Sequence, residues 1–271
     1  MHHLAKSFAV AISGYAIMDN HFHLVVFYDP RASEGWSSEE VAYRWTEAFP
    51  PRCKEANDEE LEELKALQRI KLLEDPERLA RCRRTLGSLS DFMKHLKQPI
   101  ARRANKEDNC QGHFFEGRFY SGALLDEDAV LAAMAYVDLN PVRAGIARTI
   151  EECEYTSVHQ RLAEVANRQE RLADAIRPLV SGLSEQVPMP VVSLQDYCAH
   201  LRKLVIADAP NGRIWQLKVL ALQKRERAYG HRKRLLVWAH ARGWKRSGGM
   251  LADQLTRAAG QDTSSLRAVR F

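Results

Sequence analysis

The first two apolar segments of the chain cover residues 8–18 and 21–28. Both are compatible with β structure, and Asp19 and Asn20 between them are typical turn residues. The pattern therefore predicts a β-hairpin. Because successive side chains of a strand point to opposite faces, we expect His21 and His23 to share one face and Phe22 to enter the core.

Helical patterns follow the hairpin. The sequence Ser37-Ser38-Glu39-Glu40 is a capping box that predicts a helix start, and Pro50-Pro51 predicts the end of that helix. Residues 58–84 are charge-rich, with an apolar residue at every third position from Leu61 to Leu73, and should break near Pro76. We expect residues 31–88 to form a helical insertion outside the core.

A further helix is expected from Ser90, with Phe92, Leu96 and Ile100 on an apolar stripe and with cations elsewhere. After it, residues 113–124 (HFFEGRFYSGAL) carry aromatic side chains around Gly117 and predict a strand with a bulge.

Residues 126–139 predict a helix, because acids open it and Asn140-Pro141 should stop it. Tyr136 and Asn140 are four residues apart and should lie one turn apart on one face, together with Ala132. We expect this stripe to leave Tyr136 accessible to a ligand, because the apolar face is formed by other residues, namely Val130, Leu131, Met134 and Val137.

The second half of the chain has mainly helical patterns, at residues 156–168, 194–205 and 215–240. We expect one domain over residues 1–150 and a basic helical accessory region over residues 151–271. Pro188-Met189-Pro190 is a candidate linker, and the tail after Gly248-Gly249 is expected to be weakly structured.

Composition narrows the class of protein. The chain has 271 residues, of which 45% are hydrophobic, so it can form a substantial core. Its net charge is +5, and eleven basic residues between Arg213 and Arg246 face one acid, which favours nucleic acid as a partner. The scattered cysteines argue against a zinc finger or a disulfide framework. No apolar run reaches the ~20 residues of a membrane span, and we expect a cytoplasmic protein without a membrane partner.

The histidine pair and Tyr136 suggest a chemistry. Two imidazoles on one strand face can bind a divalent metal ion but leave positions for a third ligand, phosphate or water. Asn140 is a candidate for the third ligand. A tyrosine hydroxyl beside a metal-bound phosphate is suited to in-line attack on phosphorus. Taken singly, each feature also has an ordinary explanation in packing or surface charge, so the hypothesis depends on their combination.

That combination resembles a known family. Three motifs carry the likeness: residues 18–26 (MDNHFHLVV), residues 115–119 (FEGRF) and residues 136–145 (YVDLNPVRAG). Together they resemble the single-tyrosine HUH transposases, and most closely the branch that includes the REP-associated tyrosine transposases. The resemblance covers about residues 5–160.

The resemblance implies an α+β fold with a ferredoxin-like antiparallel sheet, and Mg²⁺ or Mn²⁺ as cofactor. It implies that His21 and His23 are metal ligands, that Tyr136 is the nucleophile and that Asn140 is a helper ligand. The substrate would be single-stranded, hairpin-containing DNA, cleaved and rejoined through a covalent 5′-phosphotyrosine by a homodimer. Such domains have a strand and a helix before the hairpin, whereas only residues 1–7 precede it here. We therefore expect either that the start of the chain is misassigned or that the chain is a truncated relative that lacks the first strand.

Several basic residues are candidates for contacting DNA. Two alternatives to a transposase remain open. One is a truncated or domesticated protein that binds DNA without cleaving it, and the other is a metal-dependent phosphodiesterase in which water attacks and Tyr136 is only structural. The DNA-binding candidates are Lys94, Lys97, Arg102, Arg103, Arg118 and Arg143.

Overall fold

The computed structural model describes residues 1–53, 57–167, 169–184, 187–205, 222 and 227–243. These residues form a mixed α and β structure that is mostly helical and contains a small three-stranded antiparallel sheet. They belong to two compact units. Unit 1 comprises Met1–Ala11, Phe27–Arg118 and Val180–Val187, and unit 2 comprises Ile12–Val26, Phe119–Leu179 and Pro188–Phe271. Both units combine distant segments of the chain, so their division does not follow the expected boundary near residue 150.

The predicted hairpin is confirmed. Strand β1 (Val10–Ile17) leads into β2 (Phe22–Tyr28), and the Met18 N–H donates to the His21 carbonyl at 2.9 Å, which closes the turn. The order of strands is β2-β1-β4, so β1 is central. The sequence did not reveal β4 (Val180–Ser181), which is only two residues long and has no hydrophobic period of its own.

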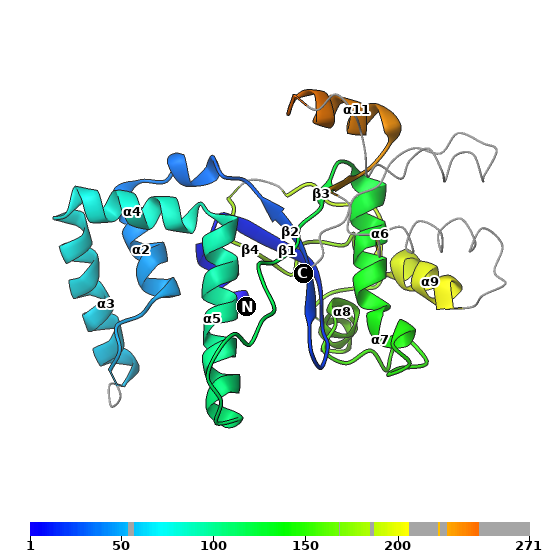
Figure 1. Ribbon diagram of the computed structural model, residues 1–271, viewed down its shortest axis with the longest axis horizontal. Coiled ribbons are helices and arrows are strands. Elements are labelled where there is room, and N and C mark those ends of the chain that lie inside the picture. The colour runs from blue at the N-terminus through cyan, green and yellow to red at the C-terminus, as the bar shows by residue number, and fades with distance from the viewer. Residues whose placement is uncertain (54–56, 168, 185–186, 206–221, 223–226, 244–271) are drawn as a thin grey trace. The chain divides into compact units, whose positions relative to one another are not determined.

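Helices α2 to α5 of unit 1 begin and end close to the predicted positions, whereas α1 and η1 were not predicted (Figure 1). Ser37 accepts a hydrogen bond from the Glu40 N–H at 3.1 Å and so caps α2. Pro76 is the first residue of α4, which confirms the predicted break, because proline suits the first turn of a helix. The elements are α1 (His2–Ser7), η1 (Ala32–Glu34), α2 (Ser38–Ala48), α3 (Asp58–Leu73), α4 (Pro76–Leu86) and α5 (Leu89–Glu107).

The apolar residues at every third position of α3 do not form a buried stripe. Leu67 is 55% exposed and Ile70 is 53% exposed, whereas Leu72, which lies off the stripe, is fully buried. A residue in an α-helix advances about 100°, so three-residue steps drift around the helix and cannot stay on one face. The buried core of unit 1 instead gathers around Phe8, whose ring meets the Phe92 ring edge-on with centroids 5.5 Å apart.

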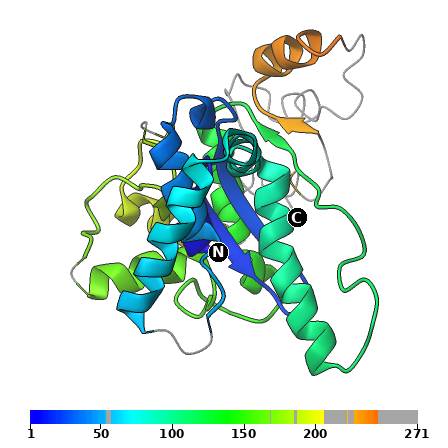
Figure 2. The same cartoon turned by 90° about the vertical axis from the view of Figure 1, so that its left-hand side faces the viewer.

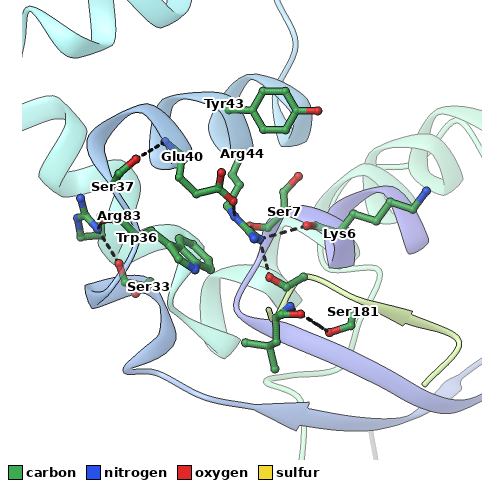
Figure 3. Close-up of polar contacts among 12 residues, drawn as sticks. Lys6, Ser7, Ser33, Trp36, Ser37, Glu40, Tyr43, Arg44, Arg83 and Ser181 are labelled. Atoms are coloured by element: carbon green, nitrogen blue, oxygen red, sulfur yellow. Dashed lines mark hydrogen bonds and ion pairs between the residues drawn. The ribbon is translucent and has the colours of Figure 1, made fainter. Parts of the chain in front are cut away.

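One arginine ties several segments of unit 1 together (Figure 3). The Arg44 guanidinium donates to the carbonyl oxygens of Lys6, Ser7 and Gly182 and pairs with Glu40 at 2.5 Å. It also stacks over the Trp36 ring at 4.1 Å. Arg44 therefore connects α2 with the end of α1 and with the residue that follows β4.

Unit 2 is built around α6. Its helices α6, α8 and α9 contribute to one hydrophobic core, and α9 has the bounds that the sequence predicts. Strand β3 pairs in parallel with β5. The elements are β3 (Ala123–Leu124), α6 (Glu127–Asp138), α7 (Asn140–Arg143), α8 (Ser157–Ala166), α9 (Leu194–Val205), β5 (Ala228–Tyr229) and α11 (Arg232–His240).

Two predicted elements are wrong. Of the strand expected over residues 113–124, only Ala123 and Leu124 are in β structure, and Phe115 and Gly117 contact Lys97 of α5 instead of pairing with a strand. The helix expected over residues 215–240 is interrupted by β5 and by Gly230, whose φ is +151°. The rest of that expected helix, before residue 227, lies outside the described residues except for residue 222, and so does the tail after Gly249.

Among the described helices, none combines the length and the apolar character that crossing a membrane requires.

Candidate active site

Three predicted site residues of unit 2 lie in one row. The ring centroids of His21 and His23 are 4.8 Å apart, and those of His23 and Tyr136 are 5.5 Å apart. In both pairs the rings meet edge to face, at 86°. The fold therefore brings together a strand and a helix that are far apart in the sequence, as the hypothesis of a shared site requires.

The hairpin fixes the two histidines. His21 directly precedes β2, and its Nδ1 lies 2.7 Å from Oδ1 of Asn20, which restrains the ring. His23 is fully buried, whereas Phe22 is only half-buried, so the expectation that Phe22 enters the core is wrong. Leu24 on the same face as Phe22 is buried, with 1% exposure, so this face is covered farther along β2, whereas α6 contacts the histidine face.

Contacts at Gly14 of β1 show how α6 meets this face of the hairpin. A Cβ atom at Gly14 would lie 3.4 Å from side-chain carbons of both Met134 and Val25. Val25 follows His23 by two residues and so shares its face of β2. Glycine at this position lets α6 approach the sheet closely, which places Tyr136 beside His23.

Tyr136 is not accessible as expected, since only 4% of it is exposed. The prediction assumed that the stripe with Ala132 faced away from the core, but residues from Ala132 to Asp138 are all buried. Helix α6 contacts the core on every side over these residues, as is typical of a helix that is apolar all round. The helical period relates Ala132 to Tyr136 within α6, but the period alone does not say how many faces of a helix its neighbours cover.

Asn140 does not hold the expected position on the helix of Tyr136. Helix α6 ends at Asp138, Leu139 is its C-cap, and Asn140 begins the separate helix α7. The helical spacing of four residues between Tyr136 and Asn140 is therefore broken. The last residue of α7, Arg143, does reach the site, because its guanidinium carbon lies 4.8 Å from the centroid of the Tyr136 ring.

The donor groups fit a metal ion only in part. Two imidazoles on one strand face can supply two ligands for a divalent cation. Within the described part of the chain, no three His, Cys, Asp or Glu side chains are placed to hold a metal ion together. Any ion held by His21 and His23 would therefore need other donors, such as an amide oxygen, phosphate oxygens or water.

A buried carboxylate that was not predicted from the sequence, that of Asp138, lies two residues after Tyr136. Oδ1 of Asp138 accepts hydrogen bonds from the Ser157 hydroxyl at 2.5 Å and from the Val158 N–H at 2.9 Å. Oδ2 accepts from the Tyr197 hydroxyl at 2.6 Å. Asp138 is fully buried, and this burial raises the pKa of its carboxyl group. An acid within the apolar run of α6 was the available signal, because buried carboxylates need such partners.

The hydrogen bonds of Asp138 join α6 to α8 and α9, two helices that were expected to belong to an accessory region. The fully buried Arg161 of α8 adds to the cluster, since its Nη2 donates to the Ser13 carbonyl at 3.0 Å and to the Arg177 carbonyl at 2.8 Å. In unit 2 the helices beyond residue 150 therefore support the helix that carries Tyr136.

The remaining DNA-binding candidates lie in unit 1. Lys94, Arg102 and Arg118 are exposed to solvent. Arg103 is exposed too, but it pairs with Glu107 at 2.7 Å. Lys97 is half-buried, and burial lowers the pKa of its amino group.

Comparisons of the chain with protein-family models, with curated proteins and with solved structures found no match.

Proposed function

We propose that this chain is a single-tyrosine HUH transposase, a homodimeric enzyme with a ferredoxin-like core that cleaves and rejoins single-stranded, hairpin-containing DNA. The observation that carries the proposal is the row formed by His21, His23 and Tyr136. It joins the two candidate ligands to the candidate nucleophile, which is the arrangement that attack on a metal-bound phosphate needs.

The reaction exchanges one phosphodiester bond for another. The Tyr136 hydroxyl oxygen attacks phosphorus, and the bond from phosphorus to the 3′ oxygen breaks. The hydroxyl proton is lost to a base or to water, and the departing 3′ oxygen takes up a proton. The 5′ phosphate of the downstream fragment is then linked to Tyr136, and the upstream fragment ends in a free 3′-hydroxyl. Attack by another 3′-hydroxyl reverses these steps and rejoins DNA without a nucleotide cofactor.

The neighbouring side chains have distinct roles in this proposal. His21 and His23 would hold Mg²⁺ or Mn²⁺, which supplies polarisation of the phosphate when bound. The Arg143 guanidinium over the Tyr136 ring provides a positive charge that favours a phosphate next to the hydroxyl.

A labelled hairpin oligonucleotide tests the proposal. In Mg²⁺ or Mn²⁺, the wild-type protein should form a covalent adduct that survives denaturing electrophoresis, and Tyr136→Phe should form none. Tyr155→Phe is the matched control, because Tyr155 belongs to the same unit but is 68% exposed and should not be needed. An adduct with Tyr136→Phe, or none with the wild type, would sink the assigned chemistry.

One observation favours a second function, namely binding of DNA without cleavage. Only 4% of Tyr136 is exposed, which leaves little of this residue open to a DNA strand. A protein of this second kind would bind hairpin DNA with steep salt dependence and give no adduct with either metal ion. The adduct assay therefore separates the two functions.

A further inference from the structure

We propose that α5 and residues 109–118 of unit 1 form a surface on which single-stranded DNA lies, with one base stacked on Phe114. This inference deepens the proposed function, because it takes single-stranded DNA as the substrate. It concerns how DNA is held and does not depend on the chemistry at Tyr136.

Residues 109–118 turn back along α5 (Figures 1 and 2). The turn uses left-handed backbone at Asn109, with φ of +47°, and at Gly112, with φ of +123°. Asn105 anchors its near end, since its Nδ2 donates to the Gly112 carbonyl at 3.0 Å. Lys97, two helical turns earlier, anchors the far end, since its Nζ donates to the Gly117 carbonyl at 3.1 Å. The returning segment is thus attached to the helix at two points.

Two adjacent phenylalanines between these anchors have different surroundings. Phe115 is half-buried beneath Lys97, whose Nζ lies 4.2 Å from the centre of the ring. Phe114 is 44% exposed and meets Phe115 edge to face, with centroids 5.0 Å apart. Phe115 therefore supports Phe114 from one side while solvent reaches the rest of the Phe114 ring. An exposed ring that is held in place is what stacking of a DNA base requires.

Helix α5 and the returning segment that carries this ring are rich in positive charge. Residues 94–118 contain six Lys and Arg residues against three acids, Glu107, Asp108 and Glu116. Lys94, Arg102 and Lys106 are exposed and are separated by multiples of four residues, so they follow a ridge that is about 18 Å long and turns by about 120° around α5. Arg118 is exposed at the end of the returning segment. A single strand needs such a cationic ridge for its phosphates next to an aromatic ring for its bases.

Equilibrium binding tests the surface in the Tyr136→Phe background without metal, so that no cleavage occurs. Fluorescence anisotropy would compare an oligothymidylate with an abasic strand of the same length. A length of about 12 nucleotides lies within the site sizes of single-strand-binding domains. Phe114→Ala should weaken binding of oligothymidylate about 5- to 100-fold and leave binding of the abasic strand unchanged. Phe114→Trp should preserve binding, because its ring also stacks. Leu67→Ala is the control, because Leu67 is an exposed apolar residue of α3 in the same unit.

Charge reversal provides the second arm. Lys94→Glu and Arg102→Glu should weaken binding of both strands equally and reduce the dependence on salt, because phosphates are common to both. An equal effect of Phe114→Ala on the two strands, or no effect on either, would overturn the stacking site. If the wild-type protein forms no adduct but Phe114→Ala weakens binding of oligothymidylate as expected, only the proposed function is refuted. If the adduct forms at Tyr136 but Phe114→Ala does not act selectively on oligothymidylate, only this inference is refuted.

Discussion

Asp138 provides a sharp test of how the helix of Tyr136 is supported. Replacing it with alanine removes the acceptor for three buried donors, the Ser157 and Tyr197 hydroxyls and the Val158 N–H. An unsatisfied buried donor costs about 1–3 kcal/mol. Removing the carboxylate also removes the free-energy cost of burying it, so the net loss of stability is smaller than the sum of three such costs. We expect Asp138→Ala to lower the free energy of unfolding by about 3–5 kcal/mol, the lower part of the sum for three such donors.

Urea denaturation followed by circular dichroism measures this change. Asp138→Asn retains a carbonyl acceptor in nearly the same volume and should lose less, about 2 kcal/mol. Glu154→Ala is the matched control, because Glu154 is an exposed acid in the same unit and should change stability by less than about 0.5 kcal/mol. A loss below about 1 kcal/mol for Asp138→Ala would refute the reasoning that this network holds α6, α8 and α9 together.

Two further predictions concern pH and close packing. Because burial raises the pKa of Asp138, the folded state keeps its proton to a higher pH than the unfolded state does. The stability that this proton contributes is complete below the unfolded pKa of about 3.9 and is lost as pH rises through the folded pKa. The wild type should therefore lose stability relative to Asp138→Asn as pH rises from about 4, measured as the difference between their free energies of unfolding. A difference that instead increases with pH would show that the hydrogen bonds outweigh burial. In unit 1, Gly182→Ala should cost about 3 kcal/mol in the same denaturation assay, since its Cβ would lie 2.1 Å from the Phe8 carbonyl oxygen and 2.4 Å from that of Ala5. Gly35→Ala, where the nearest atom is 3.7 Å away, should be nearly neutral, and equal losses for both variants would contradict this assignment.

Local sequence signals were sufficient for most of the elements. Turn residues and β-compatible runs located the hairpin, and Ser37 and Pro76 located helix starts through interactions confined to a few neighbouring residues. The alternation of side chains along a strand predicted that His21 and His23 share one face, and the resemblance to a family predicted that Tyr136 belongs to the same site. The structure confirms that these three rings are neighbours. Their chemical roles remain predictions.

Tertiary packing decided what these signals left open. A period shows that side chains share a face, but not which face is covered, so the burial of His23 and of Tyr136 depends on where α6 meets the hairpin. Residues 113–118 have the composition of a strand, yet Lys97 and Asn105 hold them on α5. The bond from Tyr197 to Asp138 spans 59 residues, and no local pattern encodes a contact of that range. The chain's local preferences thus determined its elements, whereas contacts between distant segments determined the surroundings of Tyr136.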